Sequence, residues 1–140
     1  IVGKGILKER LKNYIEKKNL KKSVKIINFT NNPYPFIKQA NLFILSSKYE
    51  GLPNVILESL VLKKFVISSN CRTGPKEILL NGKGGLLFNV GDYKSLGLKI
   101  IYFNDNKKKT KAMLKKAHRA LYRFDFKLNL EKYLKLIDLK

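Results

Sequence analysis

Two carboxylates, Glu50 and Glu58, stand eight positions apart around a turn followed by a helix signal. Gly51 permits a backbone conformation that brings amides close to a ligand, and Pro53 suits a helix start because its φ angle is already helical. The free N–H groups of a first helical turn, together with the helix dipole, are suited to binding phosphate. The segment Ser46–Asn54 therefore predicts a site for a phosphate-bearing ligand.

Glu58 falls about one and a half turns into the predicted helix, beside the apolar Leu57 and Leu60. A carboxylate at the edge of a core needs hydrogen-bonding partners, and paired ribose hydroxyls would supply them. Glu50 precedes the helix, where it would meet the sugar end of the same ligand. Both could instead be ordinary solvent-facing acids. Because the chain has only 10 acidic residues, their placement in this loop favours a functional role.

Strand and helix patterns alternate along the rest of the chain. Short apolar or β-branched runs predict strands, and apolar residues at helical spacing predict the helices between them. The expected strands are Ile1–Val2, Val24–Phe29, Leu42–Leu45, Phe65–Ser68 and Gly85–Phe88. The expected helices cover roughly 6–19, 34–41, 53–61, 74–80, 92–103, 106–123 and 126–138.

This alternation predicts an α/β fold: a doubly wound, Rossmann-like parallel sheet with a helical C-terminal tail over 92–140. We expect a single domain over 1–140. Ligands of such sheets bind at the carboxyl ends of the strands. That rule selects four loops, which are Gly3–Gly5, Phe29–Pro33, Ser46–Asn54 and Ser69–Pro75.

The composition narrows the classes of protein. A 140-residue chain that is 44% hydrophobic is expected to fold, and the lone Cys71 excludes an internal disulfide or a cysteine-based metal site. Its apolar runs are too short to span a bilayer. The net charge of +20 comes almost wholly from dispersed Lys, with only four Arg. Attraction to an anionic membrane or anionic substrates fits this pattern better than specific nucleic-acid recognition.

The string from Ser47 to Leu60 resembles the signature of family 4 of the retaining glycosyltransferases. Gly74–Leu79 resembles that family's Gly-Pro-x-Glu-Ile element, and Gly85–Asp92 resembles its next strand and turn. The resemblance extends over residues 1–103 and is most specific in the central string.

The resemblance implies two Rossmann-like domains with the active site between them, this chain being most of the C-terminal, nucleotide-sugar-binding domain. Glu50 would be the catalytic residue beside the donor sugar, and Glu58 would hold the ribose hydroxyls. The other expected donor-binding residues lie in the ligand loops: Gly51, Leu52, Pro53, Asn54, Gly3, Phe29 and Gly74.

The reaction implied is transfer of a hexose from a UDP- or GDP-sugar to a glycan or lipid-linked acceptor, with retention of configuration and without metal or other cofactor. The acceptor would bind an N-terminal domain absent from this chain. The family's diphosphate-gripping Arg and Lys would precede Ile1, in a missing first strand–helix unit. The fragment alone is therefore expected to be inactive, and the full protein cytoplasmic, bound peripherally to the inner face of the plasma membrane.

Three alternatives remain at this point. The chain could bind nucleotide without catalysis, which a transfer assay on the full-length protein would test. It could be a basic Rossmann-like module for nucleic acid or anionic lipid, which the salt dependence of binding would test. It could also belong to an epimerase or phosphorylase of the same two-domain build, although the Glu50–Glu58 string favours a transferase.

Overall fold

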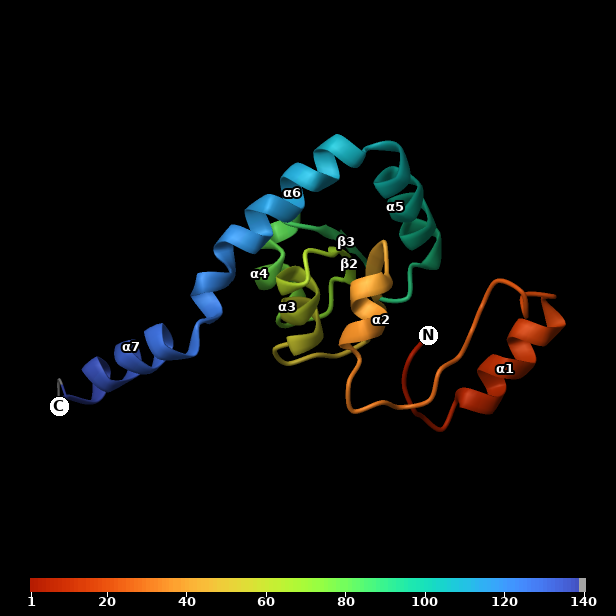
Figure 1. Cartoon of the computed structure of the whole chain (residues 1–140), viewed down its shortest axis with the longest axis horizontal. Coiled ribbons are helices and arrows are strands. Elements are labelled where there is room, and N and C mark those ends of the chain that lie inside the picture. Colours follow the sequence, from red (N-terminus) through yellow and green to blue (C-terminus); the bar gives the residue numbers. More distant parts are fainter. Residues whose placement is uncertain (139–140) are drawn as a thin grey trace. The chain divides into compact units, whose positions relative to one another are not determined.

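The computed structural model describes residues 1–138 (Figure 1). The chain divides into two compact units, residues 1–36 and the residues from Ile37 onward. The division falls within the short helix α2 (Tyr34–Gln39). The expectation of one domain over 1–140, lacking a first strand–helix unit, stays a prediction.

The first unit contains helix α1 (Lys8–Lys17) and a single parallel bridge between Val2 and Ile27. The strand expected over 24–29 is therefore wrong, because only this one bridge forms there. Its backbone bonds run from Ile27 N to the Ile1 oxygen at 2.7 Å and from Gly3 N to the Ile27 oxygen at 3.0 Å. After Gly3 the chain turns toward α1 and leaves the segment that contains Ile27. Residues 28 and 29 therefore have no neighbouring backbone with which to extend the ladder.

The second unit is built on a parallel sheet of three strands in the order β1-β2-β3. Their bounds are β1 Leu42–Leu45, β2 Phe65–Ser69 and β3 Leu86–Phe88, within one residue of those expected. Crossover helices separate the strands, as parallel pairing requires. The predicted α/β architecture with a parallel sheet is confirmed.

Helices fill the connections and the C-terminal tail. They are α3 (Asn54–Val61), α4 (Pro75–Ile78), the 3₁₀ turn η1 (Leu80–Gly82), α5 (Tyr93–Asp105), α6 (Lys107–Arg119), the 3₁₀ turn η2 (Ala120–Phe124) and α7 (Phe126–Asp138). The helix expected over 106–123 thus ends at Arg119 and continues as a tighter 3₁₀ turn. Asp92 caps α5, since its carboxylate accepts a hydrogen bond from the Ser95 amide at 2.9 Å.

The core of the second unit has two sides, because successive residues of a strand face opposite sides of the sheet. On one side, Val66 of β2 packs with Ile56 and Leu60 of α3 and with Ala117 of α6. On the other, Phe65 and Ile67 pack with Phe88 and with side chains of α5 and α6. Figure 1 shows α3 and α5 flanking the strands. Helices therefore cover both faces, as expected for a doubly wound sheet.

The neighbouring residues Leu60 and Val61 of α3 allow a test of this core. Leu60 is fully buried, whereas Val61 is 60% exposed. We expect Leu60→Ala to lower the free energy of unfolding by about 2–5 kcal/mol through the cavity it leaves. Val61→Ala should change it by less than about 0.5 kcal/mol. Chemical denaturation of both variants checks this, and equal losses would contradict the assigned packing of α3.

Candidate functional site

Two loops leave the same edge of the three-stranded sheet. One joins the end of β1 to α3 and carries Glu50, and the other joins the end of β2 to α4 and carries Gly74. Because β1 and β2 are parallel neighbours with Leu45 opposite Ser68, their carboxyl ends lie side by side. The carboxyl edge is the ligand-binding edge of open α/β sheets.

Hydroxyl groups on the second loop hold the backbone of the first. The buried Ser69 donates a hydrogen bond from Oγ to the carbonyl oxygen of Ser47 at 2.6 Å. Thr73 donates from Oγ1 to the carbonyl oxygen of Glu50. The backbone on either side of residues 48 and 49 is therefore anchored to β2 and to the loop that follows it.

A close approach at Gly74 reinforces this attachment. Gly74 has a φ of +86°, in the left-handed region that favours glycine. A Cβ atom added there would overlap Cδ of Pro53 and the carbonyl oxygen of Gly51, and would lie 3.3 Å from Cγ of Pro53. The two loops can pack this closely only because position 74 has no side chain.

The start of α3 presents unsatisfied amides at this edge. Pro53 is buried and its carbonyl accepts from the Ile56 amide at 2.9 Å. The amides of Asn54 and Val55 belong to the first turn, where no carbonyl of the helix can accept from them. Within the described chain no side chain caps this end of α3. The loop backbone and these amides form a concentration of donors suited to an anion.

Both predicted carboxylates belong to this segment. Glu50 lies in the loop and Glu58 in α3, and both are half-buried. By contrast Tyr49, between the two anchored carbonyls, is 86% exposed. The structure thus brings seven of the nine predicted site residues onto the two loops and α3: Glu50, Gly51, Leu52, Pro53, Asn54, Glu58 and Gly74.

The remaining two, Gly3 and Phe29, lie in the first unit. There they flank the carboxyl ends of the bridged segments, since the Gly3 amide donates to the Ile27 oxygen. Lys4 places its Nζ 4.9 Å from the centroid of the Phe29 ring. This cation–π contact places the ammonium group of Lys4 beside Gly3 and Phe29, the two residues predicted from the sequence.

The anchoring hydroxyls of Ser69 and Thr73 were not identified from the sequence. Both fall within the Ser69–Pro75 loop that the strand-end rule selects, but their partners lie 22 and 23 positions away. Only the register of β1 against β2 brings these partners together. A hydroxyl directly after a buried strand was the available signal.

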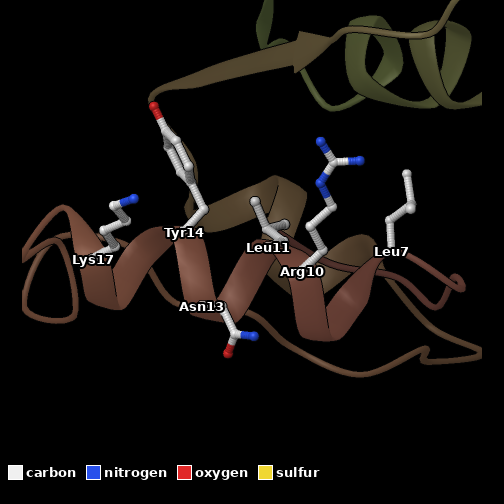
Figure 2. Close-up of a pocket in the computed structure, with 6 residues that line it drawn as sticks. All are labelled: Leu7, Arg10, Leu11, Asn13, Tyr14 and Lys17. Carbon is white, nitrogen blue, oxygen red and sulfur yellow. The ribbon is translucent and has the colours of Figure 1, made fainter.

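The helix α1 bears a separate, shallow hollow of about 430 Å³. Figure 2 shows that most of its lining side chains rise from one side of α1, whereas that of Asn13 points the opposite way; the others are Leu7, Arg10, Leu11, Tyr14 and Lys17. The lining is apolar and cationic and contains no carboxylate, imidazole or thiol. It therefore lacks carboxylates such as Glu50 and Glu58 of the β1–α3 segment.

The Gly74 contact predicts a specific cost for an added methyl group. Gly82 has the same φ of +86° but no atom within 4 Å of its would-be Cβ, so it is a matched control. We expect Gly82→Ala to cost about 1 kcal/mol of stability from backbone strain, and Gly74→Ala about 1–3 kcal/mol more from overlap. Chemical denaturation measures both. Equal costs would show that the two loops do not pack as described.

The chain is similar to known glycosyltransferases in sequence. The sequence profile of the family described as glycosyl transferases group 1 matches residues 1–120. An uncharacterized glycosyltransferase of Methanocaldococcus jannaschii is 47% identical over 79 residues, covering 56% of this chain and 20% of its own length. A Campylobacter jejuni enzyme is 34% identical over 121 residues, covering 80% of this chain and 33% of its own length. That enzyme is named N-acetylgalactosamine-N,N'-diacetylbacillosaminyl-diphospho-undecaprenol 4-alpha-N-acetylgalactosaminyltransferase.

Among solved structures, a variant of TarM from Staphylococcus aureus in complex with fondaparinux, alpha-GlcNAc-glycerol and UDP superposes with a TM-score of 0.86. It is 26% identical in sequence, and the match covers 97% of this chain and 28% of that one. The chain therefore spans a third or less of these relatives. Because the family profile matches residues 1–120 and the fold superposes on that of the TarM variant, the chain belongs to the group 1 glycosyl transferase family.

Proposed function

We propose that this chain binds the nucleotide-sugar donor in a retaining hexosyltransferase. The observation that carries the proposal is the β1–α3 loop, which is anchored to the neighbouring strand and leads into an uncapped helix start at the carboxyl edge of a parallel sheet. A donor diphosphate is dianionic, and fixed amides stabilise such charge without having to reorient. Membership of the family supports the reaction class.

The two carboxylates take different roles in this proposal. Glu58 lies one turn beyond the first-turn amides, so a diphosphate at Asn54 would place the ribose hydroxyls within its reach. Glu50 precedes those amides, on the side where the transferred sugar would lie. There its negative charge would stabilise positive charge that develops on the sugar in the transition state.

For the donor we propose a UDP-sugar rather than a GDP-sugar, supported by the UDP present in the TarM variant complex. For the acceptor we propose a glycan or lipid-linked glycan, supported by the diphospho-undecaprenol acceptor in the name of the C. jejuni enzyme. The acceptor would bind a part of the protein outside this chain. A lipid-linked acceptor implies work at the inner face of the plasma membrane, and the net charge of +20 would favour peripheral attachment there.

We further propose that transfer needs no divalent metal. Basic side chains and the start of α3 would together neutralise the leaving diphosphate, which is the role a metal fulfils elsewhere.

Binding of a panel of nucleotide sugars tests the proposed donor. We expect UDP-sugars to raise the melting temperature of the full-length protein more than GDP- or ADP-sugars at equal concentration, because binding to the folded state stabilises it. Added EDTA should leave this stabilisation unchanged. Failure of every nucleotide sugar to shift the melting temperature would refute the donor role, and loss of the shift in EDTA would refute metal-free binding.

Substitution of the two carboxylates tests their separate roles. In the full-length enzyme, Glu58→Ala should weaken donor binding roughly ten- to a hundredfold through lost charge-assisted hydrogen bonds. Glu50→Ala should instead lower kcat at saturating donor. Glu131→Ala, an exposed carboxylate on α7, is the control for charge removal. Steady-state kinetics and donor titration separate the cases, and an unchanged donor Kd in Glu58→Ala would make Glu58 a structural residue.

A further inference from the structure

The outward side of α6 carries cations without acidic neighbours in the helix. Residues 106–119 contain six Lys and one Arg and no Asp or Glu. Thr110 and Ala117 are buried, which fixes the inward side of α6. Four exposed basic residues on the opposite side follow each other at spacings of three or four and so form one row along the helix. We call this row the α6 ridge; it consists of Lys108, Lys111, Lys115 and Arg119.

The adjoining helix α5 exposes aliphatic side chains that a purely solvent-facing helix would not need. Leu98 is 67% exposed and Ile101 is 58% exposed, and they stand three positions apart, on neighbouring turns of one face. The two helices follow each other in the chain with only Asn106 between them and meet at a corner, visible in Figure 1. Lys107 places its Nζ 3.8 Å from the centroid of the Phe103 ring, which ties the start of α6 to α5.

From this combination we propose that α5 and the α6 ridge form a surface that lies on an anionic lipid bilayer. Basic side chains are attracted to the negative potential of such a bilayer, and aliphatic side chains enter its interfacial region. Nucleic acid would satisfy the cations but gives exposed Leu and Ile nothing to contact. This inference rests on the proposed function, because it names the face by which the transferase would approach a lipid-linked acceptor.

A surface of basic and aliphatic side chains lies on a bilayer without crossing it. Within residues 1–138 no helix is long and apolar enough to cross a membrane. The basic helix α1 is a weaker candidate, because it contains acidic residues and Glu9 forms an ion pair with Lys12 at 2.8 Å. Such pairing reduces the positive potential that α1 offers to a bilayer. The α6 ridge has no acidic residue within its own helix to reduce its potential in this way.

Vesicle binding of matched variants tests the surface. The ridge variant carries Lys108→Gln, Lys111→Gln, Lys115→Gln and Arg119→Gln. The control removes the same charge from exposed lysines of the first unit by Lys17→Gln, Lys18→Gln, Lys22→Gln and Lys25→Gln. Co-sedimentation of the full-length protein uses phosphatidylcholine vesicles with and without phosphatidylglycerol, at low and high salt.

We expect the wild type to bind only the vesicles that contain phosphatidylglycerol, and less at high salt. The ridge variant should lose roughly several hundredfold in affinity, since each of the four basic side chains near an anionic surface contributes about fivefold. The control variant should lose much less. A third variant, Leu98→Gln with Ile101→Gln, should also bind more weakly, and its unchanged binding would exclude α5 from the surface.

Equal losses in the ridge and control variants would overturn the proposal, because binding would then follow net charge alone. Tighter binding to a DNA duplex at the same salt, lost in the ridge variant, would assign the ridge to nucleic acid instead. Melting-temperature shifts by UDP-sugars, measured in parallel, keep the two ideas apart. If the wild type binds vesicles but no nucleotide sugar, the proposed function is contradicted. If the ridge variant binds vesicles and nucleotide sugar as tightly as the wild type does, only the proposed membrane surface is contradicted.

Discussion

Burial of β2 on both of its faces is the constraint from which the second unit follows. All five residues of Phe65–Ser69 are buried, so each face of the strand must be covered by other elements. The crossover from β1 supplies α3 to one side, and the chain after β3 supplies α5 to the other. Since β1 and β2 are parallel neighbours, the loops that follow them and precede α3 and α4 emerge at one edge of the sheet. The place of the candidate site is thus a result of how the central strand is buried.

The same burial links the core to the loop chemistry. β2 ends in two serines, which are buried polar residues that need hydrogen-bond acceptors. Ser69 satisfies this need with a carbonyl of the β1–α3 loop, so this contact contributes both to the stability of the sheet edge and to the position of the loop. A binding loop held in this way does not have to be ordered by its ligand, which lowers the entropic cost of binding.

Much of this arrangement was predictable because the strong signals are local. Leu42–Leu45 and Phe65–Ser68 are unbroken apolar or β-branched runs, and both are strands within one residue of the prediction. Residues 24–29 carry a similar pattern yet form only a bridge, because strand formation depends on the neighbouring segment as well as on the local sequence. The hydroxyl contacts of Ser69 and Thr73 could not be predicted from the sequence, since each joins residues more than twenty positions apart. The glycine at position 74 was selected by resemblance, but its packing against Pro53 required coordinates.

The position of β1 has a consequence for the behaviour of the protein in solution. In the sheet of the second unit β1 pairs with β2 on one side only, so its other edge has backbone groups without a strand partner in that sheet. The strand is Leu-Phe-Ile-Leu, without the charge, proline or bulge that commonly blocks pairing between molecules. An apolar edge of this kind is a template for adding strands from other copies. Residues 37–140 produced alone would therefore tend to self-associate, and a lysine introduced in β1 would be the direct way to keep that fragment monomeric.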